Sequence, residues 1–135
     1  MVERASTVPQ ADRSRKTRRG PTIGLGTVWV VVDVSGDLEI LDRVSERLRS
    51  LSEGALTRAR EGLDGTSIAV AVHQICARAA ARQSAPASVP VLHPLASGDQ
   101  LAVVGREFLA WIVASSDADA LERWRSDIGR LRAVV

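Results

Sequence analysis

Residues 89–114, VPVLHPLASGDQLAVVGREFLAWIVA, decide the fold class that the sequence predicts. Three short apolar runs lie within this stretch, and turn residues separate them: 89–95, 100–104 and 107–114. Runs of this length, rich in β-branched and aromatic residues, predict a three-stranded antiparallel meander. Pro90 and Pro94 lack a backbone N–H group, so the first of these strands is expected at a sheet edge.

Upstream of the meander, residues 27–34 (TVWVVVDV) predict a buried central strand. The period changes after the turn at 35–37, where Ser35 or Asp37 is the expected helix cap. A helix is predicted over residues 38–62, with a bend at Gly54. Its expected buried stripe consists of Leu41, Val44, Leu48, Leu51 and Ala55.

Two more helices follow from the same kind of periodicity. Thr66 or Ser67 caps a predicted helix over residues 66–82, although a short strand over 68–72 is the competing interpretation. The expected inner face of this helix consists of Ile68, Val72, Ile75, Cys76 and Ala79. Ser116 or Asp117 caps the last helix, whose expected stripe consists of Ala120, Leu121, Trp124, Ile128 and Leu131.

The order β-α-α-β-β-β-α predicts an α+β domain. We expect a small four-stranded, mostly antiparallel sheet with helices packed on one face. The 135 residues suit one domain, which we place at residues 23–135. Residues 1–22 have no apolar periodicity and end in a Gly-Pro pair, so we predict a disordered, arginine-rich tail there.

Charge is distributed unevenly between these two parts. The tail carries six basic and two acidic side chains, whereas residues 23–135 carry twelve basic and fourteen acidic ones. A basic cluster of this kind is suited to non-specific contact with nucleic-acid phosphates, and a solvated terminus without a partner is the alternative. The candidate contact residues are Arg13, Arg15, Lys16, Arg18 and Arg19.

Residues 33–37 (DVSGD) bring a carboxylate and a hydroxyl to the end of the first predicted strand, where they could converge on a divalent cation. The string resembles the metal-dependent adhesion motif of von Willebrand A domains, Asp-x-Ser-x-Ser, with Asp37 at the last position instead of Ser. This five-residue resemblance implies a cation-binding site near Asp33 and Asp37. A small enzyme that uses an acidic site at these two residues is a separate alternative. A strand-to-helix turn with a cap requires the same residue types.

A second resemblance covers residues 27–52. The run VVVDVSGDLEILDRVSERLRSL looks like the opening strand, turn and helix of the STAS regulatory domains, which bind anti-sigma factors. Those domains continue with a short buried strand and a phosphorylation turn. Here residues 52–63 have helical character instead, although residues 64–67 (DGTS) have the composition of such a turn.

Three soft ligands are candidates for a zinc site or a thiol–base pair, namely His73, Cys76 and His93. A structural zinc site needs four ligands, and a buried thiol with two histidines at the core edge explains the same residues. The sequence contains no phosphate loop, nucleophile elbow or Cys-x-x-Cys motif. We therefore expect no cofactor.

These observations favour a small, non-enzymatic binding or regulatory module that acts through protein contacts, either with a protein partner or in a homo-oligomer. Trp111 and Trp124 are the candidate interface residues, because tryptophan is enriched at binding hot spots. A lone cysteine and the lack of an apolar leader indicate the cytoplasm, and no membrane contact is expected. The excess of arginine over lysine suggests a GC-rich bacterial genome.

Overall fold

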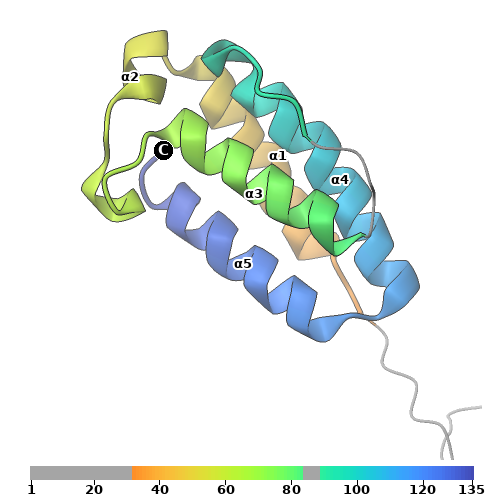
Figure 1. Ribbon diagram of the computed structural model, residues 1–135. Helices are drawn as coiled ribbons and strands as arrows, with labels where there is room; N and C mark the ends of the chain where they lie inside the picture. The colour runs from red at the N-terminus through yellow and green to blue at the C-terminus, as the bar shows by residue number, and fades with distance from the viewer. Residues whose placement is uncertain (1–31, 84–88) are drawn as a thin grey trace, which may run out of the picture. The chain divides into compact units, whose positions relative to one another are not determined.

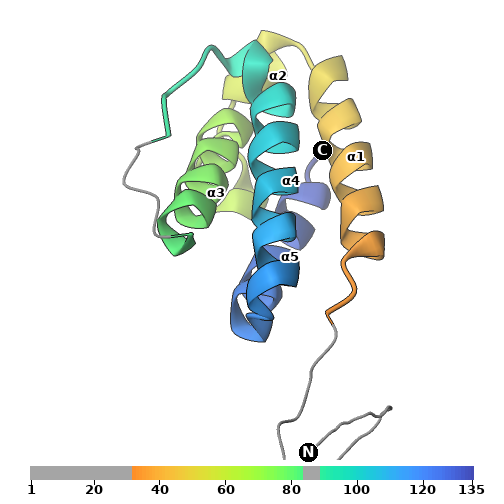
Figure 2. The same ribbon diagram turned by 90° about the vertical axis from the view of Figure 1, so that its right-hand side faces the viewer.

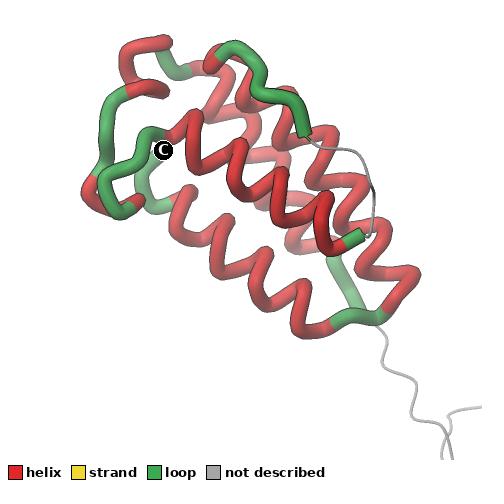
Figure 3. Tube along the Cα trace, in the orientation of Figure 1, coloured by secondary structure: helices red, strands yellow, loops and turns green. Residues whose placement is uncertain are grey.

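The computed structural model describes residues 32–83 and 89–135. Helices make up 77% of these residues, and this part of the chain contains no strand. An isolated antiparallel bridge joins Ala59 to Ser67. The predicted α+β fold with a four-stranded sheet is therefore wrong, because the described residues form a helical domain (Figure 3).

Four long helices build this domain. The elements in chain order are α1 (Ser35–Ser50), α2 (Glu53–Thr57), the 3-10 helix η1 (Glu61–Leu63), α3 (Ile68–Arg82), the 3-10 helix η2 (Pro94–Ala96), α4 (Ser97–Ser115) and α5 (Ala118–Arg132). Figures 1 and 2 show α1, α3, α4 and α5 side by side, and α4 contacts the other three. α1 and α5 run in one direction, and α3 and α4 run in the other, so the domain is a four-helix bundle.

The N-terminal end of α1 differs from its expected form. Ser35 is the first residue of the helix, and Asp37 lies in its first turn. Asp33 Oδ1 accepts hydrogen bonds from Ser35 N (3.0 Å) and Ser35 Oγ (2.8 Å). The expectation that Ser35 or Asp37 caps this helix is therefore wrong, since the helix has no side-chain cap and both short-range bonds to a side chain here are accepted by Asp33.

The buried stripe of α1 is confirmed at Leu41, Val44 and Leu48. The predicted continuation of the helix to residue 62 is wrong. Leu51 takes an extended backbone conformation, and Ser52 Oγ accepts a hydrogen bond from Ala55 N to cap α2. The break therefore precedes Gly54, because a serine that caps a new helix cannot also continue the old one.

α3 confirms the helical interpretation of residues 68–82. Ser67 Oγ accepts a hydrogen bond from Val70 N at 3.2 Å, which caps the helix as one of the two expected residues. The competing strand over residues 68–72 is wrong. All five residues of the predicted inner face are buried: Ile68, Val72, Ile75, Cys76 and Ala79.

α4 is the principal correction. Residues 97–115 form one helix, so the predicted strands at 100–104 and 107–114 are wrong, as is the turn between them. The buried apolar residues recur at three- and four-residue spacing: Leu101, Gly105, Phe108, Leu109 and Ile112. Because α4 packs against three other helices, its buried surface is wide and its polar face is narrow. Tertiary packing overrides the strand propensity of its valines and aromatic residues.

Two glycines that suggested turns are contact points between helices. A Cβ atom at Gly105 would lie 2.8 Å from both methyl groups of Leu41 and 3.0 Å from Trp124 Cη2. A Cβ atom at Gly98 would lie 2.7 Å from the backbone oxygen of Ser45. Real Cβ contacts are not this short, so glycine at both positions permits the close approach of α1 to α4.

The predicted edge strand over residues 89–95 is also wrong. Residues 89–93 have no regular secondary structure, and η2 begins at Pro94. Proline suits the first position of a helix because its missing N–H group would have no intrahelical acceptor there. Ala96 N donates a hydrogen bond to His93 O at 2.8 Å and closes the turn.

α5 agrees with its prediction. Asp117 Oδ1 accepts a hydrogen bond from Ala120 N at 3.0 Å and caps the helix. Ser116, the residue before this cap, has a φ of 55° and takes the left-handed conformation that ends α4. The predicted stripe is buried at all five positions: Ala120, Leu121, Trp124, Ile128 and Leu131.

The N-terminal predictions fall largely outside the described residues. Of the first predicted strand, residues 27–31 lie outside them, and residues 32–34 have no regular secondary structure. The predicted tail, residues 1–22, also lies outside them, together with Arg13, Arg15, Lys16, Arg18 and Arg19.

Candidate protein-binding surface on α4

α4 carries apolar side chains on the side that it turns away from the bundle. Val103, Ala110 and Ala114 share one face of the helix by their seven- and four-residue spacing, and all three are exposed. Val113 is exposed beside them. The exposed fraction is 59% for Val103 and 49% for Val113. We call these four residues the outer face of α4.

The charges on α4 are few. Asp99 and Arg106 each form an ion pair with α1, through Arg49 and Asp42 respectively. Arg49 Nε donates to Asp99 Oδ1 at 2.7 Å, and this bond raises the pKa of the Arg49 guanidinium. The remaining charged residue of α4 is the exposed Glu107. A solvent-facing helix surface normally carries more polar residues than this.

The segment before α4 extends the exposed apolar surface. Val91 is 81% exposed, and Leu92 and Leu95 are about half exposed. Gln100 Nε2 donates to Pro90 O at 2.9 Å, which fixes this segment against the first turns of α4. The segment therefore presents its apolar side chains from a defined position instead of covering them.

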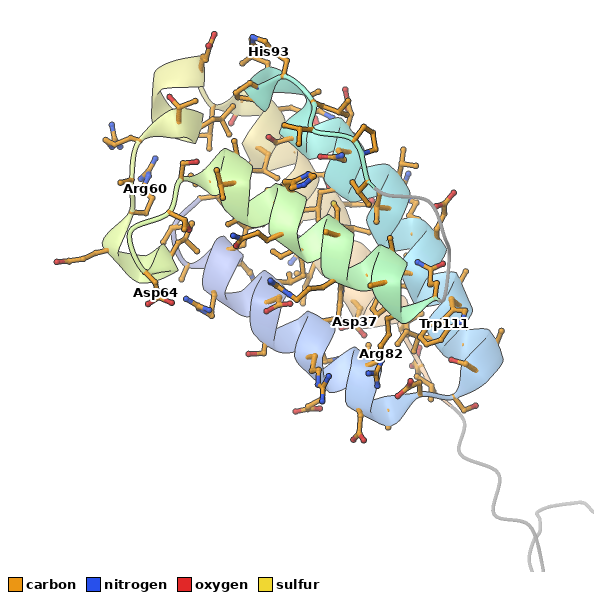
Figure 4. All side chains as sticks on the ribbon, viewed as in Figure 1. Asp37, Arg60, Asp64, Arg82, His93 and Trp111 are labelled. Atoms are coloured by element: carbon orange, nitrogen blue, oxygen red, sulfur yellow. The ribbon has the colours of Figure 1, made fainter. Side chains whose placement is uncertain are left out.

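The two candidate interface tryptophans have different surroundings. Trp124 is 4% exposed and lies in the core. Trp111 is half-buried near the C-terminal end of α4 (Figure 4). Phe108 lies between them, with ring centroids 5.8 Å from Trp111 and 5.3 Å from Trp124. Of the two, Trp111 is the one with surface available to a partner, at the edge of the outer face.

Of the two acidic residues near the start of α1, Asp37 is held by an arginine and Asp33 by a serine. Arg125 of α5 donates from Nε and Nη2 to the two carboxylate oxygens of the buried Asp37, both at 2.8 Å. The two hydrogen bonds from Ser35, with a smaller contribution from the charge of Arg125, hold the pKa of Asp33 below its usual value. A cation at Asp37 would have to displace this guanidinium.

The structure does not bring the three soft ligands together. Cys76 is fully buried in the core, whereas the exposed His93 lies before α4 with its Nε2 3.8 Å from Glu53 Oε1 (Figure 4). His73 Nδ1 is buried and has no hydrogen-bond partner in the described part of the chain. Within residues 32–83 and 89–135, no three His, Cys, Asp or Glu side chains form a group that could hold a metal ion.

The Cys76 thiol should react slowly with thiol reagents while the protein is folded. Its burial raises its pKa to about 12, so the reactive thiolate is scarce at neutral pH and the reagent has no access to it. Labelling with a chromogenic disulfide in native buffer and in denaturant measures the two rates. Native labelling as fast as the denatured rate would contradict the burial of this residue.

A small cavity of about 140 Å³ lies between η1, α3 and α5. Arg78 pairs with Asp127 at 3.1 Å and Arg130 pairs with Asp64 at 2.8 Å along its lining. Since each charged group of the lining is paired with one of opposite sign, the cavity presents no excess charge to a ligand.

Comparison with protein-family models, curated proteins and solved structures found no match to this chain. None of the helices in the described ranges is long and apolar enough to span a membrane. The outer face of α4 is what sequence reasoning missed. Helical spacing at Val103, Ala110 and Ala114 was the available signal, and it was hidden because a strand interpretation assigns Val103 and Ala110 to separate strands.

Proposed function

We propose that the protein is a small non-enzymatic binding module that acts through protein contacts, with the outer face of α4 as its contact surface. The observation that carries this proposal is the exposure of apolar side chains on a helix that is otherwise well packed. Burying such side chains against a partner releases about 25 cal/mol for each Å² of apolar surface.

The surroundings of the outer face support the same role. Trp111 lies at its edge, and Leu95 and Val91 continue the apolar surface beyond the N-terminal end of α4. Charged pairs at Asp99 and Arg106 border it on the α1 side. Glu107 is the charged side chain within the face, since it lies four residues after Val103 and three before Ala110. A largely apolar centre with a charged rim is the usual composition of a protein–protein interface.

The proposal includes a cytoplasmic location. Cys76 is a free, buried thiol, so this domain makes no use of a disulfide. Cysteine that stays a free thiol is typical of proteins from reducing compartments.

A photo-crosslinking amino acid in place of Val103 tests the proposed function. In the full chain, expressed in the cells that produce it, this position should crosslink to a protein, which mass spectrometry then identifies. Val70 of α3 is the matched control, because it is also an exposed helical valine, at 46%. The identified chain, once purified, should bind the wild type and should bind Val103→Arg at least tenfold more weakly.

Two results would contradict the proposed function. One is crosslinking at position 103 that does not exceed crosslinking at position 70. The other is a purified partner that binds Val103→Arg as tightly as the wild type.

A further inference from the structure

We propose that the contact surface serves a second copy of this chain, in a two-fold symmetric dimer in which α4 packs antiparallel against α4. This inference rests on the proposed function and names the partner. It follows from the arrangement of charges on α1 and α4 together with the apolar residues between them.

Two ion pairs of opposite polarity bridge α1 and α4. At Arg49–Asp99 the positive charge lies on α1, and at Asp42–Arg106 the positive charge lies on α4. The two pairs are seven residues apart on each helix, which corresponds to about 10 Å along the axis. The described surface of these two helices therefore carries a square of alternating charges, with the exposed Glu46 beside Arg49 as a further charge on α1.

This square is self-complementary under a two-fold axis. The axis lies in the contact plane, at right angles to α1 and α4, and passes midway between Asp99 and Arg106. It places the second copy's α4 face to face with the first and in the opposite direction. Asp99 of one copy then faces Arg106 of the other, and Arg49 faces Asp42 of the other. These four contacts join opposite charges, as electrostatic complementarity between partners requires. Glu46 lies close to the same axis and therefore approaches Glu46 of the second copy, but each of these carboxylates is already paired with Arg49 of its own chain at 3.1 Å.

The same axis brings apolar residues together. Val103 lies almost at the midpoint between Asp99 and Arg106, so it meets Val103 of the second copy. Ala110, seven residues further along, passes over the N-terminal end of the other α4, where Leu95 is half exposed. The small side chains of Ala110 and Ala114 allow the two helices to approach closely. The symmetry thus covers the most exposed valine of α4 and an exposed leucine that the monomer leaves in water.

Sedimentation equilibrium of the full chain over a range of concentrations tests the dimer. The wild type should approach twice the 14.4 kDa chain mass. Val103→Arg places two like charges at the axis and should leave the chain monomeric, whereas Val70→Arg on α3 should still dimerise. A wild type that stays monomeric at all concentrations would overturn the dimer, and it would leave the proposed function standing if position 103 crosslinks to a different protein.

A mixing experiment tests the antiparallel register. Asp99→Arg alone and Arg106→Asp alone each create two like-charge contacts in a homodimer, so each should raise the dissociation constant at least about tenfold. In an equimolar mixture of the two variants, both contacts become attractive, and dimers should reappear. Both altered residues are exposed, so each variant should fold, which circular dichroism checks. A mixture that dimerises no better than its components would overturn the proposed register.

Discussion

Replacing Phe108 with alanine is expected to lower the free energy of unfolding by about 3–5 kcal/mol. Phe108 is 3% exposed, and its ring contacts both Trp111 and Trp124. The substitution removes a large buried ring and leaves a cavity where α4 packs against the core. Since small domains are stable by only about 5–15 kcal/mol, this loss is a large part of the total.

Urea unfolding at one fixed protein concentration measures this effect, because association would make the midpoint depend on concentration. Arg123→Ala is the control, since Arg123 is an exposed residue of α5 and such changes alter stability by at most about 0.5 kcal/mol. If Phe108→Ala costs no more than Arg123→Ala, the ring does not lie in the core.

Replacing Gly98 with alanine should lower the free energy of unfolding by about 1–3 kcal/mol. The new Cβ atom would lie 2.7 Å from the backbone oxygen of Ser45 and 2.9 Å from Arg49 Cγ. A backbone atom in the middle of α1 cannot move without moving the helix. The variant therefore has to separate α1 from α4 or distort the first turn of α4.

Gly129→Ala is the matched control and should have the opposite sign. Gly129 lies in α5, and a Cβ atom there would meet nothing within 4 Å. Alanine is a better helix former than glycine, so this variant should gain about 0.5–1 kcal/mol. Thermal unfolding of the two variants measures the sign of each change in stability relative to the wild type. A stabilised Gly98→Ala would contradict the close packing of α1 on α4.

Three of the four long helices could be predicted from the sequence. α1 and α5 each bury one stripe of apolar residues that recur at helical spacing between charged ones. The buried residues of α3 recur at the same spacing, although its charged residues are limited to Arg78 and Arg82. α5 was the clearest case, since all five residues of its predicted stripe are buried. Amphipathic periodicity was sufficient to predict a helix that buries one face and exposes the other to solvent.

α4 could not be recognised in the same way, because apolar residues lie on both its buried and its outer face. Gly105 and Arg106 divided its sequence into two runs of strand-forming residues. A glycine in a sequence can indicate either of two structural features. It marks a turn when the backbone needs a positive φ, and it marks close packing when a neighbour needs the space of a Cβ atom. Only the three-dimensional contacts with Leu41 and Trp124 distinguish these meanings.

The candidate site was predictable in part. Sequence reasoning selected Trp111, which lies at the edge of the outer face, but it also selected Trp124, which is buried. The helical spacing of Val103, Ala110 and Ala114 was readable in principle, although a helix face is defined only once the helix itself is recognised. The ion pairs that suggest a two-fold axis join residues 50 and 64 positions apart, and no local pattern reports such distances.

The long separation of these pairs has a consequence for synthesis on the ribosome. The partners of Arg49, Asp42 and Asp37 follow them by 50, 64 and 88 residues. At a synthesis rate of about 5–20 residues per second, α1 is exposed for roughly 3–18 s before the residues that cover it have been made. The first helix of the bundle to be translated thus waits longest for the residues that cover it. A nascent chain paused within α4 would hold a finished amphipathic helix whose apolar stripe is available to chaperones.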